Sequence, residues 1–141
     1  KTFVVGTSLG GMVTNLLGCS EAPVDALISV MYATNTAHLV WNSDIARYIK
    51  KDLVEAGVQY EQLEHAWRVI NPGRFKLTVR KQDVLLISGS HDLFITKEDS
   101  EGLQAAWGNP VRKMVACGHS GLNVCTAELS AIIVHFLQEH R

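Results

Sequence analysis

Apolar positions along the chain follow two patterns that alternate. Short, nearly continuous apolar runs are typical of strands in a parallel sheet that is covered on both faces, and they lie at residues 3–5, 25–33, 83–88 and 112–117. Elsewhere apolar side chains recur every three or four residues, as on one face of a helix, in residues 9–17, 43–57, 60–70, 97–107 and 129–137. The alternation predicts an α/β fold: a three-layer sandwich of flanking helices around a parallel sheet of about four strands in sequential order.

Residues 34–73 carry the weakest pattern of the chain. Ser43 can cap the first of two helices predicted here, and Gly57 can end it. Apolar stripes on helices are usually faces of a core. We therefore interpret both helices as covers of the sheet.

A Gly-x-Ser-x-Gly motif joins the first predicted strand to the first predicted helix, at Gly6, Ser8 and Gly10. In this context the motif presents the serine hydroxyl on a sharp, strained turn. We expect side chains at Gly6 and Gly10 to collide with the neighbouring turn, so that both positions need glycine. The first free N–H groups of the helix, beginning with Leu9, then point toward whatever the hydroxyl attacks. A turn that only packs closely, or one that binds phosphate, has the same glycine pattern.

Two further polar residues each follow a predicted strand. Asp92 ends the tetrapeptide Gly-Ser-His-Asp after the third strand, and His119 follows a glycine after the fourth. The order serine, acid, histidine, with each residue just past the carboxyl end of a strand, resembles the α/β-hydrolase family. The three motifs together span the whole chain.

The resemblance implies a serine hydrolase that acts on an ester, thioester or amide through an acyl-enzyme, with a small acyl substrate and no cofactor. Ser8 matches the nucleophile, Asp92 the acid and His119 the base, and the Leu9 N–H matches one donor of the oxyanion hole. A serine hydroxyl needs a base within hydrogen-bond reach, and a carboxylate on the far ring nitrogen holds that base in the right tautomer. In the family, helices inserted where residues 34–73 lie form a cap that often shapes the acyl pocket.

Other histidines and acids are weaker candidates for these roles. We interpret the remaining histidines as a loop residue before the acid (His91), as members of the candidate cap (His38, His65) and as solvent-facing residues of the last helix (His135, His140). Asp99 forms a capping box with Thr96, which accounts for its presence. Cys117 and Cys125 are predicted core thiols, and Cys117 lies near the base, where it is a candidate for oxidation.

The resemblance matches this chain to the C-terminal half of the family's fold. The first strand here matches the fifth of the family's eight, which lies in the middle of its sheet, so we expect a bare apolar edge on this strand. The family's second oxyanion-hole donor follows its third strand, and we expect that donor to come from outside this chain. Either an N-terminal half on another chain or a second copy of this chain then pairs with the bare edge. A catalytically weak or inactive homodimer, or a binding module, is the alternative function.

Length, composition and charge indicate what kind of protein this is and which partners are not expected. A length of 141 residues fits one domain, residues 1–141, and 47% hydrophobic with 19% charged residues is typical of a globular protein. The net charge of −1 gives no reason to expect nucleic acid or an anionic membrane as partner, and no apolar run reaches the length of a membrane span. Three cysteines without a Cys-x-x-Cys pair predict reduced thiols and a cytoplasmic protein. No spacing of His, Cys and carboxylate residues predicts a metal site.

Overall fold

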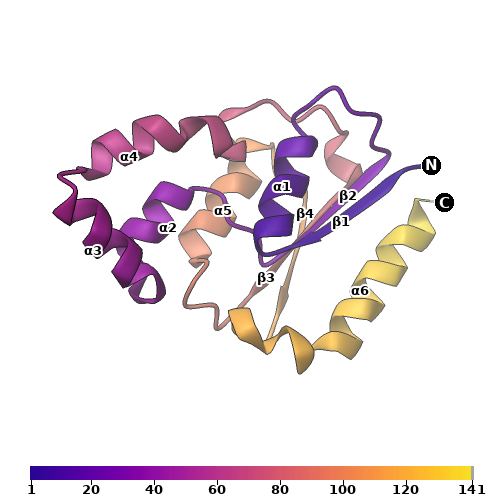
Figure 1. Ribbon diagram of the computed structural model, residues 1–141. Coiled ribbons are helices and arrows are strands. Elements are labelled where there is room, and N and C mark those ends of the chain that lie inside the picture. Colours follow the sequence, from indigo (N-terminus) through magenta and orange to yellow (C-terminus); the bar gives the residue numbers. More distant parts are fainter. Residues whose placement is uncertain (141) are drawn as a thin grey trace.

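The computed structural model describes residues 1–140, and within them one parallel sheet organises the chain (Figure 1). Its strands are β1 (Phe3–Thr7), β2 (Ala26–Val30), β3 (Val84–Gly89) and β4 (Val111–Val115). They lie in the order β1-β2-β3-β4, and each neighbouring pair is parallel. The predicted sequential order is confirmed, and β1 lies at one edge of this sheet.

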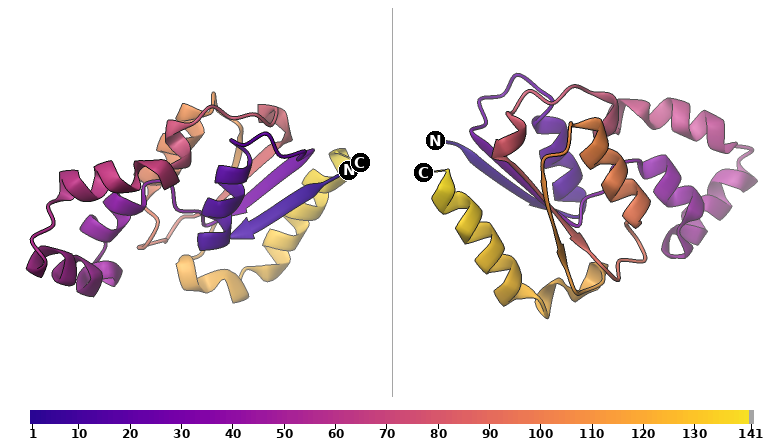
Figure 2. Two further views of the ribbon diagram at one scale, coloured as in Figure 1. Left: turned by 45° about the horizontal axis from the view of Figure 1, so that its top comes forward. Right: turned by 180° about the vertical axis from the view of Figure 1, so that it is seen from behind.

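Helices cover both faces of the sheet. The α-helices of the described chain are α1 (Leu9–Leu17), α2 (Thr36–Asn42), α3 (Arg47–Glu55), α4 (Tyr60–Trp67), α5 (Lys97–Ala106) and α6 (Thr126–Glu139), and short 3₁₀ turns lie at Asp44–Ala46, Arg68–Ile70, Pro72–Arg74, Lys81–Asp83 and His119–Asn123. Figure 2 shows α1 and α5 on one face of the sheet and α6, in yellow, on the other. The predicted three-layer architecture is confirmed.

The central strand β2 is buried because both of its faces are covered. All of its residues are buried. Ile28 packs in a core cluster that includes Phe136 of α6. Leu27, its neighbour, belongs to a second cluster with Leu103 of α5. Successive side chains of a strand point to opposite faces, so this apolar run fills the layers on both sides of the sheet.

Residues 34–73 form a separate group of helices beside the sheet. In Figure 1, α2, α3 and α4 lie on the opposite side of α1 from α6. Leu39 of α2 and Leu63 of α4 belong to one core cluster with Met12 of α1 and with Ile95. The helices therefore pack on one another and on α1, and our interpretation of both predicted helices as covers of the sheet is wrong.

Two local features of this group differ from the prediction. The sequence pattern missed α2, for which Asn35 is the N-cap. Ser43 does cap the turn that leads into α3, and Gly57 follows α3 with a φ of 80°. Only part of the apolar stripe of α3 meets the core: Leu53 packs against the cluster of Leu39 and Leu63, whereas Tyr48 and Ile49 are exposed. The spacing of apolar residues therefore predicted the helix α3 correctly, but it did not predict how much of its apolar face is exposed.

Candidate active site

The turn between β1 and α1 holds Ser8 in a strained conformation. The φ of Ser8 is 57°, in the left-handed region that is costly for residues other than glycine. Its N–H donates to the carbonyl of Val30 at 2.9 Å, which ties the turn to the end of β2. A Cβ at Gly6 would overlap the carbonyl oxygen of Gly10. Position 6 therefore needs glycine, as predicted.

Gly10 has a different environment from the predicted one. Among the residues that the structure describes, a Cβ at Gly10 would meet no atom within 4 Å. The expected collision at this position is wrong, because Gly10 lies on the exposed side of α1, next to the exposed Leu9. The close approach falls one residue later: a Cβ at Gly11 would lie 3.0 Å from the Cβ of Tyr32.

The loop after β3 holds the carboxylate of Asp92 in a fixed orientation. Its Oδ1 accepts hydrogen bonds from the N–H groups of Phe94 and Ile95, both at 2.8 Å. Its Oδ2 lies 2.9 Å from Nδ1 of His119, and the side chain is only 2% exposed. The carboxylate thus has donors on both oxygens, as a buried charge requires.

His119, which follows β4, lies between Asp92 and Ser8. Nδ1 faces a carboxylate, which accepts only, so this nitrogen carries the proton of the neutral ring. Nε2 is then the acceptor, and it lies 2.8 Å from Oγ of Ser8. The structure therefore brings together the three side chains that the sequence predicted, Ser8, His119 and Asp92. Leu9 opens α1 directly after Ser8, where the first N–H groups of a helix have no partner within the helix.

An apolar pocket of about 310 Å³ opens beside Ser8. Its walls come from α1, from α2 and the end of α4, and from the loop after Asp92. Among the lining side chains are Met12, Leu39, Val40, Trp67, Ile70 and Phe94. Two of the helices in residues 34–73 thus contribute to a hollow next to the serine.

Phe94 is a residue of this site that the sequence analysis missed. Its ring lies edge-on to the imidazole of His119, with centroids 5.0 Å apart and planes at 68°. Phe94 also lines the pocket, while its N–H donates to Asp92. The one available signal in the sequence was a large apolar residue two positions after the candidate acid.

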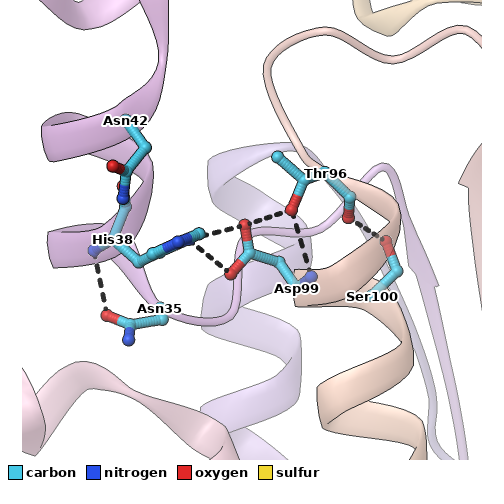
Figure 3. A network of polar contacts seen from close by, with 6 residues as sticks. All are labelled: Asn35, His38, Asn42, Thr96, Asp99 and Ser100. Carbon is cyan, nitrogen blue, oxygen red and sulfur yellow. Dashed lines mark hydrogen bonds and ion pairs between the residues drawn. The ribbon is translucent and has the colours of Figure 1, made fainter.

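A second histidine–carboxylate pair lies elsewhere in the fold. Nδ1 of His38 on α2 lies 3.2 Å from Oδ1 of Asp99 on α5. Figure 3 shows Asp99 also meeting Thr96, whose hydroxyl donates to Oδ2 at 2.8 Å. Thr96 accepts in turn from the N–H of Asp99. Thr96 caps α5 as predicted, but the full capping box is not formed, because the Asp99 carboxylate accepts from the Thr96 hydroxyl and lies against His38. The pair with His38 additionally links α2 to α5.

The other histidines divide into two groups. Three are exposed, namely His65, His91 and His135, and for His135 this confirms the predicted solvent-facing position. His140 is not solvent-facing: Nδ1 donates to the carbonyl of Phe136 at 2.6 Å, and Nε2 lies 3.3 Å from a carboxylate oxygen of Asp83. That prediction is wrong because α6 ends at Glu139. The ring of His140 packs against Phe136 and Asp83 and does not continue the solvent-facing side of the helix.

The cysteines of the described chain are free thiols. Cys117 is buried, and this burial, together with its contact with Cys125, raises the pKa of the Cys117 thiol to about 11. The reactive thiolate is therefore scarce near neutral pH, which disfavours the oxidation considered for Cys117. The cytoplasmic location inferred from reduced thiols stays a prediction.

Residues 1–140 contain neither a metal-binding cluster nor a membrane-spanning helix. No group of three or more His, Cys, Asp or Glu side chains is arranged to hold a metal ion. No helix in this part of the chain combines the length and apolar character needed to cross a membrane.

A comparison with curated proteins identifies a relative in Bacillus subtilis strain 168, named "Uncharacterized protein YdjC". It is 34% identical over 113 residues, which make up 80% of this chain and 97% of YdjC. The chain belongs to the family of YdjC. No protein-family model matches this YdjC-family chain.

Several solved structures similar to this YdjC-family chain are described as hydrolases. An esterase of Pyrococcus furiosus is 18% identical, with a TM-score of 0.63 over 98% of this chain and 53% of its own. A meta-cleavage product hydrolase of Pseudomonas fluorescens is 18% identical, with a TM-score of 0.58 over 97% of this chain and 64% of its own. An acylaminoacyl peptidase of Pyrococcus horikoshii is 19% identical, with a TM-score of 0.69 over 86% of this chain and 20% of its own. The chain thus has the α/β-hydrolase fold and spans less than two thirds of these hydrolases.

Proposed function

We propose that the chain is a serine hydrolase that cleaves an ester, thioester or amide through an acyl-enzyme. The observation that carries the proposal is the unbroken hydrogen-bonded series from Ser8 Oγ to His119 Nε2, at 2.8 Å, and from His119 Nδ1 to Asp92 Oδ2, at 2.9 Å. The strained turn at Ser8, the adjacent apolar pocket and the hydrolase neighbours support it.

In the acylation step, Oγ of Ser8 attacks the acyl carbon of the substrate. The hydroxyl proton passes to Nε2 of His119, and Asp92 stabilises the imidazolium that forms. The N–H of Leu9, at the start of α1, donates to the oxyanion. When the tetrahedral intermediate collapses, the bond to the leaving alcohol, thiol or amine breaks, and the leaving group takes the proton from Nε2.

In the deacylation step, His119 acts on water. Nε2 takes a proton from a water molecule as that water attacks the acyl carbon. The proton then returns to Oγ of Ser8 as the ester bond breaks and the carboxylic acid leaves. No metal or cofactor enters either step.

We expect the neighbouring pocket to bind the acyl part of the substrate. Its walls include Leu39, Val40, Trp67 and Ile70 from residues 34–73. We therefore interpret this segment as the cap of the site, and we expect it to select an apolar acyl group that fits a volume of about 310 Å³.

The first test of this function is Ser8→Ala, assayed with p-nitrophenyl butyrate. We expect kcat/KM to fall by roughly 10⁴–10⁶-fold, because a reaction that needs the hydroxyl loses its nucleophile. Ser120→Ala is the matched control, since Ser120 is an exposed serine next to His119, and it should retain the wild-type rate. Butyrate ester hydrolysis that survives Ser8→Ala with the fold intact would contradict the assignment.

A second candidate function is that of a catalytically weak or inactive partner-binding chain. The observation that favours it is the exposure of three apolar side chains on β1 and the following helix α1, Val5, Leu9 and Val13, which are 50%, 67% and 56% exposed. A partner on the β1 edge, either a second copy or a chain that carries an N-terminal half, would cover these side chains. Such a partner would also be in place to supply a second donor to the oxyanion beside Leu9.

A further inference from the structure

Phe94 contacts both Asp92 and His119 and also lines the apolar pocket. Its backbone N–H donates to Oδ1 of Asp92 at 2.8 Å. Its ring lies edge-on to the imidazole of His119, at a centroid distance of 5.0 Å. Phe94 is also one of the residues that line the apolar pocket. An acyl group in that pocket would therefore lie against a side chain that also contacts the base.

The contacts of His119 change during the proposed reaction. In the free enzyme, the imidazole is held at Nδ1 by Asp92 and at Nε2 by the hydroxyl of Ser8. In the acyl-enzyme, Oγ of Ser8 carries the acyl group and has no proton to donate, so the contact at Nε2 is lost. Asp92 still holds Nδ1, but a single hydrogen bond leaves the ring free to tilt about it.

We propose that Phe94 is a positioning residue for His119 in the acyl-enzyme, and that an apolar acyl group in the pocket supports it in that role. This inference rests on the proposed serine hydrolase function. The Phe94 ring, which is tilted by 68° against the imidazole, limits the tilt of the imidazole once Ser8 is acylated, and the acyl group packs against Phe94 in the pocket. Deacylation then depends on Phe94 more strongly than acylation does, and most strongly for acyl groups that fill the pocket.

The test is the pre-steady-state release of p-nitrophenol from p-nitrophenyl acetate and p-nitrophenyl hexanoate. In Phe94→Ala we expect a burst of about one equivalent, followed by a steady-state rate that is roughly 10- to 100-fold lower than wild type, as for other small misplacements of a catalytic group. The loss should be larger for hexanoate than for acetate. The backbone N–H to Asp92 remains in this variant, so the acid keeps its orientation.

Three further variants test whether Phe94 positions His119 or only lines the pocket. Ile70→Ala removes another wall of the pocket and should raise KM for hexanoate without creating a burst. Phe94→Leu keeps an apolar side chain but loses the aromatic ring, so it should show the same burst, and it replaces Phe94→Ala if that variant does not fold. Phe94→Tyr should restore the wild-type time course.

The outcomes distinguish this inference from the function on which it rests. If Phe94→Ala and Phe94→Leu behave like Ile70→Ala, with a higher KM and no burst, Phe94 is only a wall and the inference is wrong, while the hydrolase function stands. If the wild-type chain neither hydrolyses these esters nor reacts at Ser8 with an acylating reagent, both proposals are rejected.

Discussion

Asp92 and Asp99 show how neighbouring residues decide the role of a carboxylate. Each has a histidine Nδ1 as a partner, at 2.9 Å for Asp92 and 3.2 Å for Asp99. His119 pairs with Asp92, and its Nε2 faces the hydroxyl of Ser8. His38 pairs with Asp99, and this contact joins the helices α2 and α5. A histidine–carboxylate pair becomes a base for acyl transfer only where its second nitrogen meets a nucleophile.

Tyr32 carries a prediction about alkaline stability. The side chain is fully buried, and this burial raises the pKa of Tyr32 from 10.0 to about 12. Between pH 10 and pH 12 the tyrosine of the unfolded chain loses its proton while that of the folded chain keeps it, so the free energy of unfolding falls as pH rises. Over that range we expect Tyr32 to account for a loss of about 2–3 kcal/mol.

Urea unfolding at pH 8 and at pH 10–11.5 measures this effect. Tyr32→Phe should lose less stability with rising pH than wild type does, although it starts about 1 kcal/mol lower because its hydroxyl no longer donates to the carbonyl of Ser100. Tyr48→Phe changes an exposed tyrosine and should follow the wild-type curve. Equal pH dependence of wild type and Tyr32→Phe would contradict the prediction.

Sequence reasoning located the residues of the site where a local rule required them. Ser8 and Gly6 were predictable because a turn this sharp between a strand and a helix restricts both positions. Gly10 and Phe94 were not, since one depends on what surrounds α1 and the other on how a loop folds back onto His119. Local spacing encodes neither the open space beside Gly10 nor the contact of Phe94 with His119, which lies 25 residues later in the chain.

At the scale of elements, the link between α2 and α5 connects the cap to the body of the fold. His38 lies on α2, and Asp99 lies in the first turn of α5, where it also interacts with the N-cap Thr96 (Figure 3). Two other residues of α2, Leu39 and Val40, line the pocket. The pair therefore fixes the helix that forms one wall of the acyl pocket.

His38→Ala should loosen this wall. We expect the free energy of unfolding to fall by about 1 kcal/mol, as for the loss of one partly buried hydrogen bond, and KM for p-nitrophenyl hexanoate to rise severalfold with little change in kcat. Urea unfolding and steady-state kinetics check the two effects. His65→Ala, an exposed histidine of α4, is the control. If the two variants cannot be told apart, the link does not position α2.

The elements themselves differed in how well they could be predicted. The strands were evident because a strand covered on both faces is apolar at nearly every position, as in β2. The cap was harder to predict, because α2 has only seven residues and α3 exposes part of its apolar stripe. A helix of seven residues has too few turns to show a clear periodic pattern of apolar residues. An apolar stripe, in turn, does not reveal which surface will cover it.

At the scale of the whole molecule, the sheet has its candidate nucleophile at one edge. β1 pairs only with β2 among the described strands, and Val5 and Val13 are about half exposed beside it. Edge strands with apolar neighbours tend to pair with another chain. The β1 edge is thus the surface where we expect a partner to bind.

We expect the purified chain to form a homodimer through this edge. Light scattering coupled to size exclusion should give twice the mass of the chain at micromolar concentration. Val13→Glu should yield a monomer, because a charge would be buried in the contact. Val54→Glu places the same charge on α3, at an exposed residue away from β1, and should remain dimeric. A monomeric wild type would contradict pairing between copies.

The most direct test of the central claim is the reaction of the folded chain with a fluorophosphonate, followed by mass spectrometry of the peptide that contains Ser8. The account predicts one phosphonyl group on Ser8, with a rate that falls at least 100-fold in His119→Ala and no labelling after heat denaturation. A folded wild-type chain that is not labelled at Ser8, or that is labelled equally fast without His119, would contradict the claim that Ser8, His119 and Asp92 act together.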